Sequence, residues 1–173
     1  MKDSRERYGS ITRIFHWVMA LLIVWQGLKF FDRIADGEHW VGQNLVPWHG
    51  SIGSLILLLV ILRIIWALSQ HNNRPLQEPA TAALVKLGHF SLYACMVLMP
   101  VTGVMYLVGR GFGWKAFGVQ IISGGPEIPW MATVGGTLHS PLAWIFLVVV
   151  IGHVAMAFYH HFVKKDGVMK RMV

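Results

Sequence analysis

Four apolar stretches of similar length dominate this sequence and limit the folds that it can adopt. They occupy Ile14–Phe31, Trp48–Leu68, Leu84–Val108 and Thr137–Val163. Each is close to the ~20 residues that an α-helix needs to cross a lipid bilayer. Because the bilayer core holds no water to satisfy backbone N–H and C=O groups, such segments cross it as helices. The sequence therefore predicts an all-α fold, a transmembrane four-helix bundle, in a single domain over residues 1–173.

The composition agrees with a membrane protein and excludes other classes. Hydrophobic residues make up 55% of the chain and charged residues 13%, which is too apolar for a soluble domain of this size. The formal net charge is +7, but the cations flank the apolar stretches, so we expect no nucleic-acid partner. The single cysteine, Cys95, excludes an intramolecular disulfide and a CxxC redox site. Redox chemistry would therefore need a bound cofactor.

The distribution of Lys and Arg predicts how the helices are oriented. Eleven of the fifteen lie before the first stretch, around the second connection or after the fourth stretch. The other two connections hold only Lys29, Arg33, Arg110 and Lys115. This asymmetry follows the positive-inside rule and predicts that both termini are cytoplasmic. Although arginines precede the first stretch, no small-residue cleavage site follows Phe31, so we expect it to be retained rather than removed as a signal peptide.

The connection Gly109–Gly136 is long for a hairpin. It contains several glycines, two prolines and the tryptophans Trp114 and Trp130. We expect it to lie on the outer membrane surface as an irregular cap that could shape a docking site.

Five of the nine histidines lie in or at the edges of the apolar stretches. They are His16, His49, His89, His139 and His153. Ionisable residues are rare inside membranes and need partners there, yet these stretches contain almost no carboxylates. Hydrogen bonds within the core would account for any one of these histidines. Five together favour a metal or a haem.

His139 and His153 are 14 residues apart in the fourth stretch. On a helix this spacing separates them by about 21 Å and leaves them on nearly the same face. That is too far for one metal site, but it suits two haems stacked across the membrane, with the fourth helix giving a ligand to each. By depth, His49 pairs with His139 on the outer side. On the inner side both His16 and His89 lie near the level of His153, and depth alone does not decide between them.

Other residues near the inner surface are candidates for binding a quinone or a haem propionate. Arg63 lies 14 residues beyond His49, where it would offer a cation to a propionate or a quinone oxygen. Snorkelling to lipid headgroups would explain Arg63 equally well. His160 lies two turns beyond His153 and could hydrogen-bond a quinone beside the inner haem.

Four segments of the sequence resemble the bacterial cytochrome b561 family. They read RIFHWVMALLIV, WHGSIGSLILLLVILRIIW, LGHFSLY and LHSPLAWIFLVVVIGHVAMAFYHHF, and their order and spacing match over nearly the whole chain. The resemblance implies a multi-pass protein of the bacterial inner membrane with two haem b groups. It implies ligands from the first, second and fourth spans, which are His16 and His153 for the inner haem, and His49 and His139 for the outer one. His89 would then be left for quinone binding or a structural role.

The short members of this family include superoxide oxidase, which passes electrons from periplasmic superoxide through the haems to ubiquinone. This chain is similar in size and layout, so the resemblance favours a quinone oxidoreductase with superoxide as donor. Arg33, Arg110 and Lys115 are the cations available to attract the anion, although acidic residues in the same connections cancel their charge.

Two other functions stay open. The chain could be a non-catalytic cytochrome b anchor that links a periplasmic cytochrome c, a dehydrogenase or a hydrogenase to the quinone pool. It could also be an ion or metal transporter with a histidine relay, although a transporter should also show Asp or Glu among the relay groups. A reducible haem spectrum would exclude the transporter.

Overall fold

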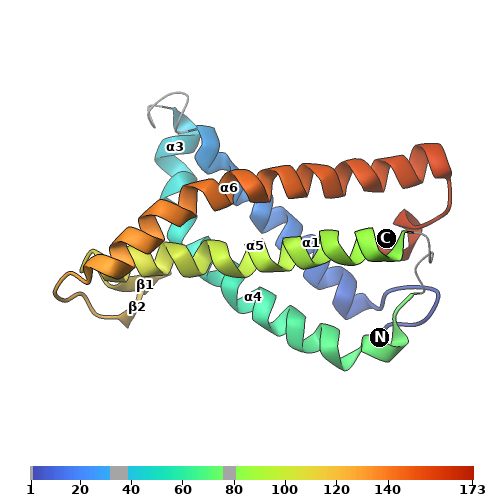
Figure 1. Cartoon of the computed structure of the whole chain (residues 1–173), viewed down its shortest axis with the longest axis horizontal. Coiled ribbons are helices and arrows are strands. Elements are labelled where there is room, and N and C mark those ends of the chain that lie inside the picture. The colour runs from blue at the N-terminus through green and yellow to red at the C-terminus, as the bar shows by residue number, and fades with distance from the viewer. Residues whose placement is uncertain (1, 32–38, 76–80) are drawn as a thin grey trace.

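Four long helices form the body of the structure, a computed structural model that describes residues 2–31, 39–75 and 81–173 (Figure 1). They are α1 (Ser10–Gly27), α4 (His49–Ser69), α5 (Ala82–Gly109) and α6 (Pro129–Phe158). With their adjoining turns, all four are long and apolar enough to cross a membrane. The predicted all-α transmembrane bundle is confirmed.

Short elements complete the chain. They are the 3₁₀ turns Leu28–Phe31, Val46–Trp48, His71–Asn73 and Met169–Arg171, the helix α3 (Trp40–Asn44), the strands β1 (Trp114–Ala116) and β2 (Val119–Ile122), and the π-helical turn Tyr159–Lys164. Both chain termini lie at one end of the bundle, which we call the terminal end, and the β1–β2 hairpin lies at the other, which we call the hairpin end (Figure 1). Termini at one end fit an even number of crossings. Which end faces the cytoplasm stays a prediction.

The connection between α5 and α6 is more ordered than the irregular cap that we expected. It contains an antiparallel hairpin, and α6 already begins at Pro129, because proline fits the first turn of a helix, where its missing N–H is not needed. Gly135 of α6 lies against the backbone of α5. A Cβ atom at this position would be 2.5 Å from the backbone nitrogen of Tyr106 and 2.6 Å from the backbone carbonyl oxygen of Thr102. The absence of a side chain lets the two helices pack closely there.

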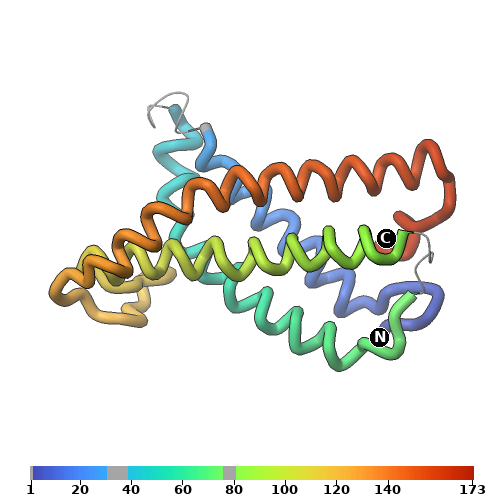
Figure 2. Tube along the Cα trace, viewed as in Figure 1, coloured from blue at the N-terminus to red at the C-terminus, as the bar shows by residue number. Residues whose placement is uncertain are grey.

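The helices α5 and α6 are close together near the hairpin end and diverge towards the terminal end (Figure 2). Pro100 lies inside α5 and Pro141 inside α6, and proline removes a backbone hydrogen bond and kinks a helix. The direct neighbours in the bundle are α1 with α4, α4 with α5, and α5 with α6. Among the described residues, the backbone of α6 barely approaches those of α1 and α4.

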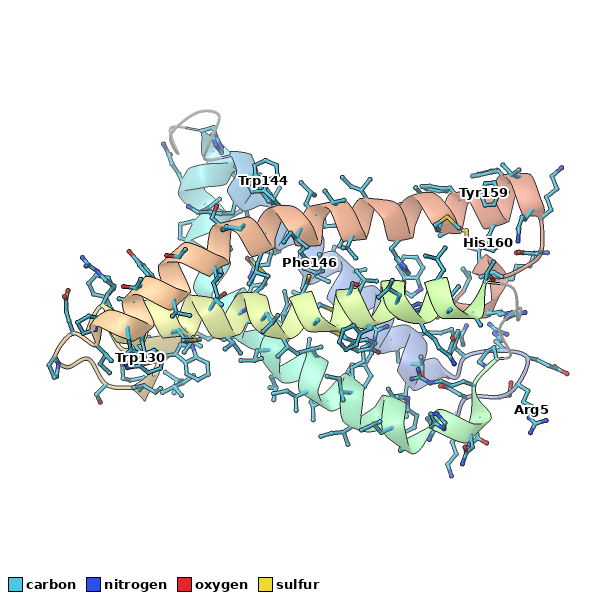
Figure 3. The ribbon with its side chains drawn as sticks, viewed as in Figure 1. Arg5, Trp130, Trp144, Phe146, Tyr159 and His160 are labelled. Carbon is cyan, nitrogen blue, oxygen red and sulfur yellow. The ribbon has the colours of Figure 1, made fainter. Side chains whose placement is uncertain are left out.

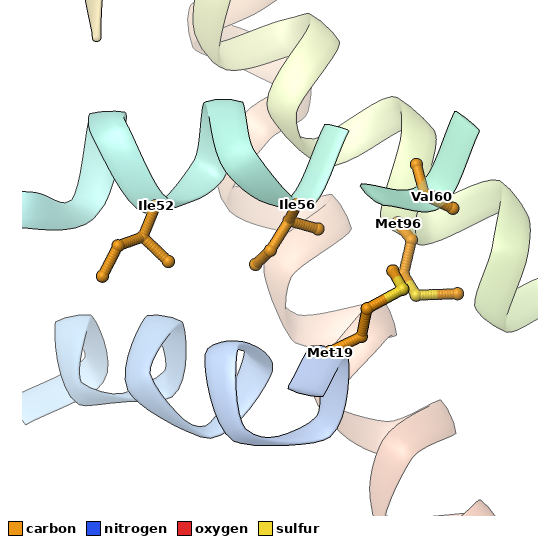
Figure 4. Packing of buried hydrophobic residues seen from close by; sticks show 5 residues of the cluster. All are labelled: Met19, Ile52, Ile56, Val60 and Met96. Carbon is orange, nitrogen blue, oxygen red and sulfur yellow. The ribbon is translucent and has the colours of Figure 1, made fainter. Parts of the chain in front are cut away.

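The hydrophobic core lies between α1, α4 and α5 (Figure 4). Its buried members are Met19, Ile52, Ile56, Val60 and Met96. In contrast, α6 has a single buried residue, Gly135. The other residues of α6 are at most partly buried, and the two histidines predicted to bind haem lie where His139 meets His49 of α4 and His153 meets His16 of α1.

Aromatic residues mark the two ends of the longest helix. Figure 3 shows Trp130 at the hairpin end and Tyr159 at the terminal end of α6, and both side chains are exposed. The 29 residue steps from Trp130 to Tyr159 correspond to about 44 Å along a helix, which matches the ~40–45 Å thickness of a bilayer with its headgroups. Tyrosine and tryptophan are enriched at these two interfaces, so α6 crosses the whole bilayer.

Candidate functional site

The first predicted histidine pair lies near the hairpin end. His49 is the first residue of α4, and His139 lies on α6, two residues before the kink at Pro141. Their ring centroids are 6.0 Å apart, and the ring planes are nearly perpendicular, at 83°. The two rings therefore meet edge to face, between helices whose backbones barely approach each other.

Three histidines come together nearer the terminal end. The ring centroid of His153 on α6 is 6.2 Å from that of His16 on α1 and 5.8 Å from that of His89 on α5. Both distances are short, so the structure brings both sequence candidates to His153 and does not decide between them by distance.

The spacing within these pairs fits two ligands of one iron. A histidine nitrogen lies about 2.0–2.1 Å from a bound metal, and the ring centroid lies about 1.1 Å behind that nitrogen. Two histidines on opposite sides of one iron therefore have centroids about 6.3 Å apart. The observed 6.0 Å and 6.2 Å, and the 5.8 Å between His89 and His153, are all close to this distance. Within the described ranges, no group of three or more His, Cys, Asp or Glu could hold a metal, and a porphyrin is a cofactor that supplies the remaining ligands itself.

His139 is contacted by Thr102 and Gly103 of α5, and the contact with Thr102 was not predicted from the sequence. The buried Thr102 hydroxyl donates to the carbonyl of Leu98 or Met99, at 2.8 and 2.9 Å, and its oxygen lies 3.2 Å from Nδ1 of His139. Since its one proton is used on the backbone, this oxygen accepts from the Nδ1–H group. Nε2 is then left as the metal-binding nitrogen, which is the usual arrangement behind a ligating histidine. At Gly103, a Cβ atom would be 3.1 Å from the His139 ring, so glycine makes room for it.

His89 has its Nδ1 atom 2.8 Å from the carbonyl oxygen of Val85, one turn earlier on α5. A carbonyl only accepts, so Nδ1 carries the proton and Nε2 has a free lone pair. This tautomer suits either an iron ligand or an acceptor of a hydrogen bond from a quinol hydroxyl.

Arg63 reaches into the bundle from α4. Its Nε donates to the Tyr93 hydroxyl at 3.1 Å, its guanidinium carbon lies 5.5 Å from the centre of that ring, and Nη1 is 3.8 Å from the sulfur of Met19. None of these partners is a carboxylate, and none of the described ion pairs includes Arg63. A cation inside the bundle without a counter-ion there is suited to an anionic haem propionate or a quinone oxygen.

His160 forms a pair with an aspartate that our sequence reasoning missed. It lies in the π-helical turn at the end of α6, and its Nδ1 is 2.5 Å from Oδ2 of Asp166. The other carboxylate oxygen accepts from the backbone N–H of Val168 at 3.1 Å. The hydrogen bond from His160 holds the pKa of Asp166 below its usual range. The chain reverses at Lys165, whose φ is +52°, and this turn brings the aspartate back to the histidine.

The predicted outer cations differ in their surroundings. Arg110 lies 3.6 Å from the Glu127 carboxylate, so a neighbouring charge offsets its own. Lys115 lies exposed on β1. Arg33, which we also considered, and the nearby acidic residues Asp32, Asp36 and Glu38 lie outside the described residues.

Comparisons with known proteins find similar sequences over nearly the whole chain. The family model for prokaryotic cytochrome b561 matches residues 7–173. Cytochrome b561 homolog 2 of Escherichia coli K12 is 30% identical, over 99% of this chain and 93% of its own length. A probable superoxide oxidase of Yersinia pestis is 26% identical, over 97% and 96%. Cytochrome b561 homolog 1 of E. coli K12 is 23% identical, over 96% and 97%.

Proposed function

Because this chain belongs to the prokaryotic cytochrome b561 family of haem b electron-transfer proteins, we propose that it carries electrons through two haems from superoxide to ubiquinone. The family and the four spanning helices place it in the bacterial inner membrane as a multi-pass protein. The observation that carries the proposal is the presence of histidine pairs at iron-ligand spacing at two depths along α6. When bound, the haems supply single-electron redox chemistry at the two depths.

The four proposed ligands are His49 with His139 and His16 with His153. We assign His16, not His89, to the iron because the resemblance to the family implies ligands from the first, second and fourth spans, and because the backbones of α1 and α6 barely approach each other. His89→Ala should therefore keep both haems and His16→Ala should lose one. If the two variants give the opposite results, this assignment is wrong.

The quinone side of the proposal lies at the terminal end. Arg63, His89 and His160 lie in the terminal half of the bundle or at its end, and the nitrogens of all three can hold quinone oxygens. Reduction of a quinone to a quinol consumes two protons, and histidine is the side chain best suited to deliver them near neutral pH. The His160–Asp166 pair is part-exposed, so it can take up protons from water. The excess of Lys and Arg near this end supports its placement in the cytoplasm.

The donor side lies at the hairpin end. Superoxide is a small anion, and Lys115 is an exposed cation there, while Arg110 is partly offset by Glu127. The similarity to the probable superoxide oxidase of Y. pestis supports this choice of donor.

A stopped-flow experiment tests the proposal. The oxidised haem protein is mixed with a pulse of superoxide, and the haem absorbance is followed before and after addition of ubiquinone. We expect the pulse to reduce the haems faster than superoxide dismutates spontaneously, and the quinone to reoxidise them. If the pulse reduces no haem in that time but a reduced periplasmic cytochrome c does, the anchor function replaces this one.

A further inference from the structure

The β1–β2 hairpin has two chemically different faces. Residues paired across the hairpin share a face, and the pairs are Trp114 with Ile122, Lys115 with Gln120, and Ala116 with Val119. Next to the turn, the polar pair and the apolar Ala116–Val119 pair lie on opposite faces, and an irregularity in register separates them from the apolar Trp114–Ile122 pair. A tight turn at Phe117 and Gly118, both with positive φ (48° and 85°), joins the strands. Val119 is 65% exposed and Phe117 is 52% exposed, so part of the apolar face has no protein neighbour.

Two hydrogen bonds attach the hairpin to the start of α4. The Trp114 indole N–H donates to the Ser54 hydroxyl at 2.9 Å, and the backbone N–H of Phe117 donates to the Ser51 hydroxyl at 3.0 Å. These serines lie about 3 and 7.5 Å along the helix from His49. The 21 residues of α4 extend about 31 Å, which matches the ~30 Å hydrocarbon core of a bilayer. The hairpin is therefore level with the border between the hydrocarbon and the headgroups.

A shallow groove of about 700 Å³ lies between the turn of the hairpin and the start of α4. Its lining residues are Pro47, Trp48, Ser51, Phe117 and Gly118. The rings of Trp48 and Phe117 are 6.3 Å apart, and both side chains are about half exposed. Leu58 and Leu62 lie 7 and 11 residues beyond Ser51, on about the same face of α4, and both are exposed apolar side chains, which face lipid in a spanning helix.

We propose that the hairpin lies in the bilayer interface, with Phe117 and Val119 against the lipid acyl chains and lipid in the groove. Amphipathic elements occupy this layer with the apolar face inward and the polar face towards the headgroups. Lys115 on the opposite face then lies on the water side of the interface, where its charge stays exposed. The hairpin does not lie deeper, because its unpaired backbone N–H and C=O groups would be unsatisfied in hydrocarbon.

Spin-label accessibility tests this placement in the haem-loaded protein. The only cysteine, Cys95, is buried in α5, so Cys95→Ala gives a background for single labels at Val119→Cys and, as the matched control on the polar face, Lys115→Cys. The proteins are placed in vesicles of phosphatidylethanolamine and phosphatidylglycerol. Collisions of the label with oxygen, which partitions into lipid, are compared with collisions with a water-soluble nickel chelate.

We expect the oxygen-to-nickel collision ratio to be several-fold higher at position 119 than at position 115. A label at Phe117→Cys should behave like that at 119, and it serves as the second site if the 119 variant loses its haem spectrum. Equal ratios at 119 and 115, with nickel access at both, would overturn the proposal and leave the apolar face to a soluble protein partner. The test does not depend on the electron donor or acceptor.

Discussion

The replacement Thr102→Val removes one hydroxyl and leaves the side-chain volume nearly unchanged, so it isolates the hydrogen bond behind His139. In the protein, the Thr102 oxygen lies 3.2 Å from Nδ1 of His139 and Thr102 is buried. After the replacement, the Nδ1–H group loses this acceptor, and a buried unsatisfied donor costs about 1–3 kcal/mol. Loss of the partner behind a ligating histidine typically weakens metal binding about 10–100-fold, which is about 1.4–2.7 kcal/mol. The two magnitudes agree.

Transfer of haem to excess apomyoglobin, followed in the Soret band, measures this loss. In Thr102→Val we expect half of the haem to leave about 10–100-fold faster than in the unmodified protein, while the other half keeps its rate because it is bound near His153. Thr102→Ser keeps a hydroxyl at this place and should release both haems slowly. The reasoning is refuted if Thr102→Val releases haem at the unmodified rate, or if Thr102→Ser releases it as fast as Thr102→Val.

Three further predictions concern the two ends of the bundle. Replacing His139 by Ala should remove one haem and replacing His153 by Ala should remove the other, since the two histidines lie at different depths. Loss of both haems from either variant, measured by absorbance, would contradict separate sites. Asp166→Asn should slow reoxidation by ubiquinone at unchanged haem content. The reason is that His160 loses a partner that stays ionised down to a pH below the usual aspartate range. An unchanged stopped-flow rate between pH 6 and 8, roughly the range of histidine titration, would exclude a role of the His160–Asp166 pair in proton delivery. Lys115→Gln should slow reduction by superoxide more at low salt than near 1 M salt, where the Debye length falls to about 3 Å; equal effects at both ionic strengths would exclude steering by this cation.

The spanning helices could be predicted from the sequence because the bilayer imposes a length and an apolar composition on each of them. The two histidines of α6 were predictable for a similar reason, since a regular helix converts 14 residues into a distance and a face. The pairing of His49 with His139 could be predicted from depth. The choice between His16 and His89 could not, because both lie near the depth of His153.

Contacts that depend on packing between helices or on irregular backbone could not be predicted. Thr102 meets His139 only because Gly135 lets α5 and α6 approach closely. Asp166 returns to His160 only because a π-helical turn is followed by a left-handed residue. The hairpin was missed because its strands are only three and four residues long, and such short runs carry little periodic signal.

The haem content of the purified protein tests the central claim most directly. The claim is that two histidine pairs, one near each end of the bundle, each hold one haem b. A pyridine haemochrome assay combined with a protein determination by amino-acid analysis gives the molar ratio without any assumption about donor or acceptor. We predict two haem b groups per chain, both extractable because no covalent attachment motif is present in the sequence. A ratio of one, or no haem at all, would contradict the account.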